Sequence, residues 1–401
     1  MSTVVVVHPD LSSKGGGESV AMAVVEALQA DHDVTLLTLS DPDVGELNEY
    51  FNADVDAGAL DVERAGVLAP AVHDRVGSSY YVLQAALLAR YARRRADEFD
   101  LVVSTVNELG LPAESVEYVH FPFDWTASMS GREEVFHPTI RDGSLYERLC
   151  TRVADVSVAG VREGTHFANS EWTAEKFADA YGLRPPVLHP PVDTEGFEDV
   201  PWSDREAGFV TVGRIEPSKR VVEVVRIVDG VRERGHDVHL HVLGPAYDRE
   251  YAARVRTMAA DREYVEVEGE VDRSELVERI STHRYGIHGK EHEHFGMAVA
   301  ETVAGGAIPF VPASGGQRAL VRDDPRLLYD SSADAVDTID AVLGDRALQR
   351  ELRRRPAEIE REFGRERFQA RIRRTAADVL DLPAPDLPAS PARLREKPRE
   401  D

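Results

Sequence analysis

Short apolar runs alternate with helical patterns along this chain, and this alternation constrains the fold more than any other feature. The first run, Val4–His8, is β-branched, and a helical pattern over Ser19–Ala30 follows it. Strands that alternate with helices build parallel sheets with helices on both faces, so the sequence predicts a doubly wound α/β fold. Further strands are expected at Val34–Leu39, Leu101–Thr105, Val116–His120 and Phe167–Asn169, with helices at Tyr80–Ala96 and Trp172–Tyr181.

A proline-rich, acidic stretch from His189 to Trp202 separates this cycle from a second one. Prolines gathered in this way indicate a loop rather than a helix or strand. The second set of strands is expected at Phe209–Val212, Val238–Leu243, Tyr264–Val267, Arg284–His288 and Ile308–Val311. We therefore expect an N-terminal domain over 1–190, a linker over 191–203, a second domain over 204–361, a helix over 362–380 and a disordered, proline- and charge-rich tail over 381–401.

Length and composition limit the compartment of the protein. The 401 residues are 42% hydrophobic, which is enough for two cores, and no run reaches the ~18 uncharged apolar residues of a membrane helix. The first residues, Met1–Val7, carry no basic region and indicate a strand rather than a signal peptide. The single cysteine, Cys150, fits a reducing cytoplasm.

The chain is strongly acidic, with a formal net charge of -25 and only five lysines, at positions 14, 176, 219, 290 and 397. An acidic surface poor in lysine is typical of a halophilic, haloarchaeal-type protein, because concentrated salt screens the repulsion between its charges. An ordinary acidic cytosolic enzyme is the alternative. Binding of nucleic acid is not expected, because it requires a basic surface.

Two carboxylates eight residues apart, Glu293 and Glu301, indicate a ligand site. An apolar run and a turn precede Glu293, and Glu301 lies in a helical pattern. The amides of Phe295, Gly296 and Met297 would be the unpaired donors of the helix N-terminus, which binds phosphate, and Gly296 allows the backbone to approach a ligand. A nucleotide sugar, with a phosphate at the helix end and hydroxyls on either side, would meet both carboxylates and the amides.

The segment His288–Gly316 resembles the E-x7-E signature of retaining GT-B glycosyltransferases of the family-4 type. It is most similar to the mannosyltransferases that extend the dolichol-linked oligosaccharide core, and the resemblance covers most of residues 1–380. It implies two Rossmann-like domains that face each other across a cleft, with the last helix crossing back to the first domain. It also implies metal-independent transfer of a hexose, with mannose the first candidate, from GDP- or UDP-hexose to a hydroxyl acceptor such as a lipid-linked glycan.

The resemblance implies a role for each polar residue of the second half. Arg214 and Lys219 would hold the donor diphosphate together with the amides of residues 295–297. A diphosphate that leaves without a metal needs cations to take up its developing charge, and lysine is rare in this chain. Glu301 would bind the ribose hydroxyls. Glu293 would contact the donor sugar or stabilise positive charge at its anomeric carbon.

Segments of the first half resemble motifs that line the cleft in the same family. The loop Gly15–Gly17 would lie near the diphosphate and the acceptor, although it matches neither the dinucleotide fingerprint nor the Walker motif, and a plain flexible turn is the alternative. His120 ends a strand and would contact the sugar or the acceptor, with a structural histidine as the alternative. Asn169–Thr173 resembles the Asn-Ser motif of the family, and Ser170 is equally suited to cap a helix.

Two further turns are expected at the donor site. Ser314–Gly316 resembles a place of close ligand approach. The segment Gly269–Val271 is expected to contact the base, and its residues do not distinguish guanine from uracil.

Other patterns favour competing functions. His288, Glu291 and His292 match the H-x-x-E-H of zinc peptidases, but Gly289 and the preceding strand place them in a turn. The D-x-D triplets Asp41–Asp43 and Asp54–Asp56 match metal-dependent GT-A glycosyltransferases, and such triplets arise by chance in so acidic a chain. A non-catalytic nucleotide-sugar binding protein and a GT-B epimerase are further alternatives.

Four arginines, Arg90, Arg93, Arg94 and Arg95, lie at the end of an amphipathic helical pattern. They could contact a membrane that carries a lipid-linked acceptor, or they could complement the helix dipole. The expected location is the cytoplasm, with peripheral contact at the inner membrane face as the open question.

Overall fold

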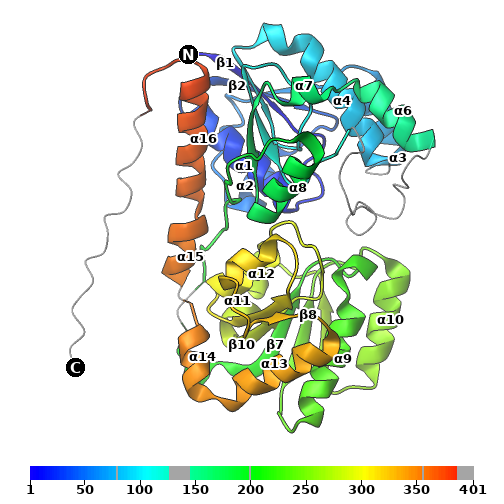
Figure 1. The fold of residues 1–401 in the computed structure, drawn as a ribbon, viewed down its shortest axis with the longest axis vertical. Coiled ribbons are helices and arrows are strands. Elements are labelled where there is room, and N and C mark those ends of the chain that lie inside the picture. The colour runs from blue at the N-terminus through cyan, green and yellow to red at the C-terminus, as the bar shows by residue number, and fades with distance from the viewer. Residues whose placement is uncertain (78–79, 126–144, 198–199, 355, 386–401) are drawn as a thin grey trace.

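Two six-stranded parallel sheets, one above the other in Figure 1, form the frame of the computed structural model. The structure describes residues 1–77, 80–125, 145–197, 200–354 and 356–385. Helices cover both sheets, so the doubly wound α/β architecture predicted from the sequence is confirmed. Both sheets have the Rossmann strand order, which reverses direction at one pair of neighbouring strands.

The first sheet has the order β3-β2-β1-β4-β5-β6, and its order reverses between β1 and β4. Its strands are β1 (Thr3–Val7), β2 (Asp33–Thr38), β3 (Asp61–Arg64), β4 (Leu101–Ser104), β5 (Ser115–Val119) and β6 (Thr165–Ala168). Its helices are α1 (Gly16–Gln29), α2 (Val44–Phe51), α3 (Leu68–Val76), α4 (Tyr81–Arg95), α6 (Leu145–Ala154), α7 (Val158–Val161) and α8 (Glu171–Tyr181).

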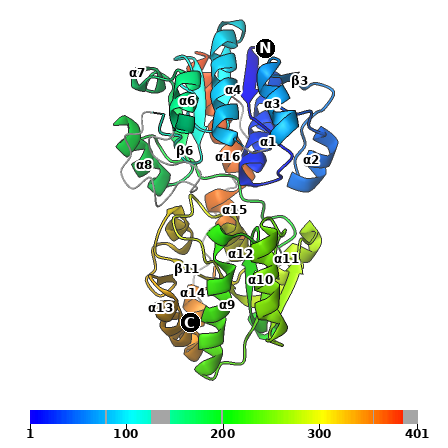
Figure 2. The same cartoon turned by 90° about the vertical axis from the view of Figure 1, so that its right-hand side faces the viewer.

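The β-branched run of β1 is buried on both faces, as its composition predicts. Successive side chains of a strand point to opposite faces. Val4 and Val6 accordingly pack into the core beneath α1, whereas Val5 and Val7 pack into the core beneath α4. Figure 2, viewed from the side of α4, shows α16 on the far side of the molecule.

The second sheet repeats this order as β12-β11-β10-β7-β8-β9, with the reversal between β7 and β10. Its strands are β7 (Glu206–Val212), β8 (His239–Leu243), β9 (Val265–Gly269), β10 (His283–Ile287), β11 (Ile308–Pro312) and β12 (Leu328–Tyr329). Its helices are α9 (Val221–Glu233), α10 (Arg249–Ala260), α11 (Arg273–Thr282), α12 (Met297–Ala304), α13 (Ser332–Gly344) and α14 (Arg346–Leu352).

The chain returns to the first sheet through α15 (Pro356–Phe363) and α16 (Arg365–Val379), which lie along one side of the molecule in Figure 1. Phe368, Ile372 and Ala376 of α16 are buried in the core beneath α1. The helix expected over 362–380 is interrupted at Gly364, because the backbone there is extended and pairs with Val192 in a β-bridge. The expected disordered tail lies outside the described residues beyond 385.

Candidate functional site

The candidate site lies where the carboxyl ends of β7 and β10 meet, at the reversal point of the second sheet. Open α/β sheets bind ligands in the crevice at such a point. The chain leaves β7 through Gly213 into a 3-10 turn at Pro217–Lys219, and it leaves β10 through residues 288–296 into α12. The two turns are in contact, since a Cβ on Gly289 would lie 2.8 Å from the Lys219 carbonyl oxygen.

Glu293 is the centre of this site. Its Oε2 lies 2.7 Å from Lys219 Nζ and 3.3 Å from His288 Nε2, and its Oε1 lies 3.1 Å from Lys290 Nζ. Burial alone would raise the pKa of Glu293, but the two ammonium groups outweigh it and hold this pKa well below its usual range. Burial lowers the pKa of Lys219, and Glu293 opposes this shift. The site therefore holds a buried carboxylate between two lysines.

The segment Ser314–Gly316 supports the turn that carries Glu293. Gly316 donates its amide to the Glu293 carbonyl at 2.7 Å, and Ser314 Oγ accepts the His292 amide at 3.0 Å. Gly315 has φ of 75°, and a Cβ there would lie 2.4 Å from the Glu293 carbonyl oxygen. Glycine is required at Gly315 and Gly316 because backbone packs against backbone there, and the ligand approach expected at this turn stays a prediction.

The N-terminus of α12 presents free amides beside Glu293. No hydrogen bond within the described part of the chain reaches the amides of Phe295, Gly296 or Met297, and the helix ladder begins with the bond from Ala300 to Gly296 at 2.9 Å. Gly296 has φ of 103°, a left-handed conformation that favours glycine. The described part of the structure thus leaves these three amides without an acceptor at the start of α12, and their role in phosphate binding stays a prediction.

Glu301 lies further along α12 and is paired with an arginine. Its Oε1 accepts from Arg273 Nη1 at 2.5 Å, and Arg273 also donates to the Asp193 carbonyl at 3.1 Å. Burial raises the pKa of Glu301, while Arg273 opposes the shift. Glu301 is therefore held in one orientation on the side of the site that faces α11.

Arg214 has contacts of its own and lies near enough to Lys219 for its charge to add to burial in lowering the pKa of that lysine. Its guanidinium lies over the Tyr247 ring, 4.7 Å from the centroid, and Nη2 lies 3.5 Å from Glu216 Oε1. Its side chain is 52% exposed. The diphosphate role expected of Arg214 stays a prediction.

The first domain contributes a glycine loop and a histidine to the same place. A Cβ on Gly16 would lie 2.9 Å from Met297 Cγ, and one on Gly17 would lie 3.7 Å from His120 Nε2. His120 Nε2 lies 3.0 Å from the Thr105 carbonyl, which can only accept, so Nε2 carries the proton and Nδ1 remains an acceptor. Burial, together with the nearby His8, lowers the pKa of His120 to about 4.

An aromatic stack and a serine join the two domains beside this loop. His294 stacks on Phe121 with 4.6 Å between ring centroids, and Trp172 lies on the same side at 5.9 Å. Ser170 Oγ accepts the Thr173 amide at 3.1 Å, which caps α8, and it donates to the His294 carbonyl at 2.5 Å. The domains are thus in direct contact at the site.

Residues 193–363, which carry Lys219, Glu293 and Glu301, match the family model for glycosyl transferases group 1. The protein is a glycosyltransferase with the GT-B fold. The glycosyltransferase is similar to the GDP-Man:Man(3)GlcNAc(2)-PP-Dol alpha-1,2-mannosyltransferase of Caenorhabditis elegans, with 25% identity over 80% of this chain and 78% of the relative.

Solved structures share the fold of this glycosyltransferase at low sequence identity. Anabaena HepE, solved in complex with UDP and glucose, has a TM-score of 0.66 and 15% identity over 94% of this chain and all of its own. The sucrose-phosphate synthase of Thermosynechococcus elongatus has a TM-score of 0.70 and 15% identity over 95% of this chain and all of its own. Within the described residues, no helix has the length and hydrophobicity needed to cross a membrane.

Two residues of the candidate site, Lys290 and Arg273, were not predicted from the sequence. The scarcity of lysine that drew attention to Lys219 applies equally to Lys290, so that signal was available. Arg273 gave no such signal, because arginines are common in this chain. Its pairing with Glu301 depends on how α11 packs beside α12.

The competing motifs do not assemble in the glycosyltransferase. Glu291 pairs with Arg220, His288 contacts Glu293, and the His292 ring stacks near Trp172, so these three form no metal-binding group in the described structure. In the D-x-D triplets, one aspartate, Asp43, caps α2.

In the arginine cluster, Arg93 donates to the Leu109 carbonyl at 2.5 Å, and Arg95 pairs with Glu98. Arg90 and Arg94 are exposed. Half of the cluster is therefore engaged within the domain.

Proposed function

We propose that this glycosyltransferase moves a hexose, with mannose as the first candidate, from a nucleotide sugar to a hydroxyl of a lipid-linked glycan. The proposal includes retention of configuration, no requirement for a metal ion, and an E-x7-E site of the family-4 type. The mannosyltransferase relatives support the donor and acceptor classes, and GDP and UDP are the two donor diphosphates to test first.

One observation carries the proposal: two lysines meet at one buried carboxylate beside the free amides of a helix N-terminus. A donor diphosphate at these amides would draw Lys219 and Lys290 away from Glu293. The lysines would then stabilise the charge that develops on the leaving group, as preorganised cations do in a water-poor site. Glu293, freed from the lysines, would face the donor sugar.

The first domain supplies the acceptor side. Because the pKa of His120 is about 4, its imidazole is neutral at pH 7, and Nδ1 can accept a hydrogen bond from a sugar hydroxyl. The leaving diphosphate oxygen would take the proton of the incoming hydroxyl on the same face of the sugar. This route needs no carboxylate nucleophile. The domain contacts through His294 and Ser170 would limit the entry of water and thus donor hydrolysis.

The test compares Lys219→Ala and Lys290→Ala with Lys176→Ala. Lys176 lies on α8 and makes a loose ion pair with Asp179 at 3.9 Å, so it serves as the matched control. Loss of one cation from the transition state should lower kcat by about 10²–10³-fold. Melting temperatures near that of the parent protein would show that the variants fold. Full activity in Lys219→Ala would contradict the proposal.

Turnover should be measured with GDP-, UDP- and ADP-sugars, each with and without EDTA, and the product identified. A transferred sugar with retained configuration supports the proposal, whereas an epimerised donor or bound but unchanged donor contradicts it. Comparison of free acceptor with acceptor embedded in vesicles tests peripheral membrane contact through Arg90 and Arg94. Equal rates on both acceptors would contradict that contact.

A further inference from the structure

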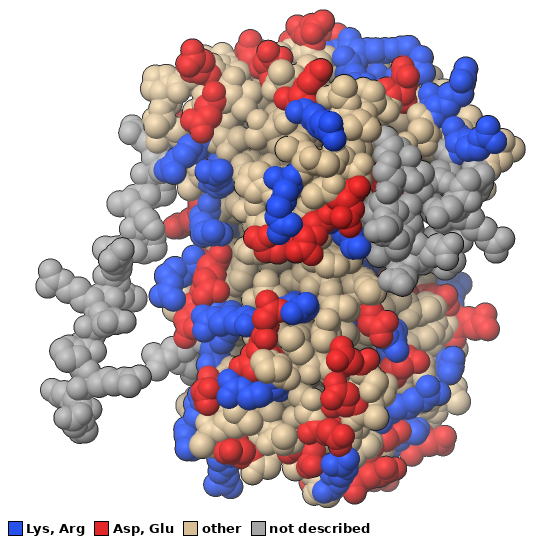
Figure 3. Space-filling model, in the orientation of Figure 1, with Lys and Arg blue, Asp and Glu red and all other residues tan. Residues whose placement is uncertain are grey.

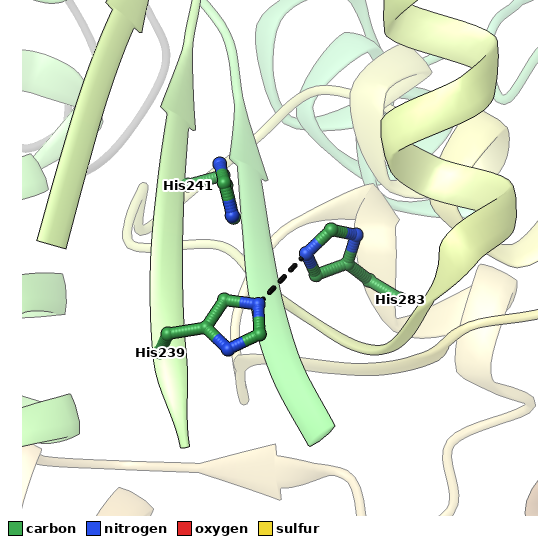
Figure 4. Close-up of side chains that lie close together, drawn as sticks. All are labelled: His239, His241 and His283. Atoms are coloured by element: carbon green, nitrogen blue, oxygen red, sulfur yellow. Dashed lines mark hydrogen bonds between the residues drawn. The ribbon is translucent and has the colours of Figure 1, made fainter. Parts of the chain in front are cut away.

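Three histidines lie close together at the amino-terminal end of the second sheet. His239 and His241 project from one face of β8, and His283 begins β10. One ring nitrogen from each lies within 4.8 Å of the other two, and Nε2 of His239 is 3.0 Å from Nε2 of His283 (Figure 4). This cluster is remote from the donor site, which lies at the carboxyl ends of the same strands.

A glycine allows the three imidazoles to meet. Strands β8 and β10 are not neighbours, because β7 lies between them. Gly208 of β7 pairs in register with His239, and a Cβ at Gly208 would lie 2.2 Å from His239 Nε2. Any other residue at this position would occupy the space of the His239 ring. The cluster therefore depends on Gly208, because the histidine side chains of β8 and β10 meet over the backbone of β7 where no side chain intervenes.

Hydrogen bonds fix the tautomers of two of the rings. His283 Nδ1 lies 2.6 Å from the Arg279 carbonyl, so Nδ1 carries the proton and Nε2 keeps its lone pair. His241 Nδ1 is bonded to the Glu268 carboxylate, which leaves Nε2 as its ligand atom. Glu268 is itself held by Arg279 at 3.0 Å. Metal-binding histidines typically donate their other ring N–H to a carboxylate or a carbonyl in this way.

We propose that His239, His241 and His283 bind one divalent transition metal ion, with zinc as the ion of choice. Three imidazoles are a common protein ligand set for zinc, with Zn–N distances of about 2.0–2.1 Å. Ligand nitrogens around such a tetrahedral ion are about 3.3 Å apart, so small ring movements would complete the geometry. Glu206 Oε2 lies 3.4 Å from His239 Nε2 and is the candidate for the fourth position.

The ion would tie β8 to β10 across β7. The pairing of β10 with β7 is irregular between His283 and Tyr285, so the ion would stabilise the sheet where its own register is broken. This role is structural and independent of sugar transfer. Binding to the folded state alone would raise the melting temperature by mass action.

The experiment titrates zinc chloride into untagged, chelator-treated protein by calorimetry and follows the melting temperature. We expect one ion per chain, and a rise in Tm of about 5–10 °C at a zinc concentration 100-fold above Kd. His239→Ala and His283→Ala should each lose this ion. Glu268→Gln should bind one ion with about 10–100-fold lower affinity, because the three ligand histidines remain and the hydrogen-bond partner of His241 is changed.

His236→Gln is the matched control, because His236 belongs to the same domain and contacts Asp340 instead of the cluster. It should bind zinc as the parent protein does. His288 and His292 are intact in all of these variants, so loss of the ion in His239→Ala locates it at the cluster. No stoichiometric zinc in the parent protein, or unchanged zinc affinity in His239→Ala, would overturn the proposal.

Discussion

Two buried glutamates in this enzyme show how the surroundings of one side chain decide its charge. Glu293 lies between Lys219 and Lys290, which hold its pKa well below the usual range despite burial. No cation of the described residues is a main cause of the pKa shift of Glu108. Glu108 accepts from the Tyr181 hydroxyl at 2.7 Å and from the Asp124 amide at 3.0 Å, and burial, the dominant cause, raises its pKa to about 8. At pH 7 the first is an anion and the second a neutral acid.

The raised pKa of Glu108 predicts that stability falls as the pH rises. Its unfolded pKa is about 4.3, so between about pH 5 and pH 8 the folded state holds a proton that the unfolded state has lost. The free energy of unfolding should then decrease by roughly 1 kcal/mol per pH unit from this group. Glu108→Gln mimics the neutral acid and should flatten this slope in urea unfolding between pH 5 and pH 8. An unchanged slope in the variant would contradict a protonated Glu108.

At the scale of the element, the N-cap of α8 also joins the two domains. The hydroxyl of Ser170 accepts from the Thr173 amide and donates to the carbonyl of His294 in the Glu293 turn. Ser331 caps α13 in the same way, accepting from the Asp334 amide at 3.2 Å, and α13 belongs wholly to the second domain. A comparison of variants at the two serines therefore distinguishes the effect of the helix cap from the effect of the domain contact.

We expect Ser170→Ala and Ser331→Ala each to cost about 1 kcal/mol of stability, because each removes one cap. Only Ser170→Ala should also loosen the Glu293 turn, since the His294 carbonyl loses its donor. Hydrogen exchange of the His292 and Gly316 amides, which are both hydrogen-bonded in this turn, measures this difference. Faster exchange in Ser170→Ala alone supports the domain contact, and equal exchange in both variants contradicts it.

Most of the strands predicted from the sequence are buried on both faces and are therefore rich in apolar residues. The strand at Val4–His8 is buried on both faces, so its apolar run is visible without a structure. Strands β3 and β12 were not predicted, because both lie at sheet edges, where a strand pairs with a neighbour on one side only. Strand β3 has the sequence Asp-Val-Glu-Arg, and β12 has only two residues, so neither forms an apolar run.

The part of the candidate site that could be predicted is the part whose residues are neighbours in the sequence. Glu293, the amides of 295–297 and Glu301 belong to one turn and one helix, and the structure places them as expected. Arg273 and the histidine cluster depend on the packing of separate elements, and a single sequence does not show that packing. The side chain of Arg214 shows the same limit, since its position in the chain fits the donor site but does not show that its guanidinium lies over the Tyr247 ring.

At the scale of the molecule, charge is the dominant feature. The chain has 72 acidic and 47 basic residues, and Figure 3 shows both kinds interspersed over the face in view. Some charges hold α16 against the first domain: Arg365 and Arg373 of α16 pair with Glu26 and Asp31 at 2.9 and 2.8 Å. Salt weakens such partly exposed pairs, and it also screens the repulsion of the excess acid, so the two effects oppose each other.

We predict that repulsion outweighs the ion pairs, and that potassium chloride raises the melting temperature at pH 7.5. The screening length falls from about 10 Å at 0.1 M to about 3 Å at 1 M salt, which reduces repulsion over the whole surface. A gain of about 1–2 kcal/mol would raise Tm by roughly 2–8 °C. The control is the same titration near the isoelectric point of about 5.0, where the net charge vanishes and the rise should disappear. A melting temperature that falls with salt at pH 7.5 would show instead that surface ion pairs dominate, and it would contradict the halophilic interpretation of the composition.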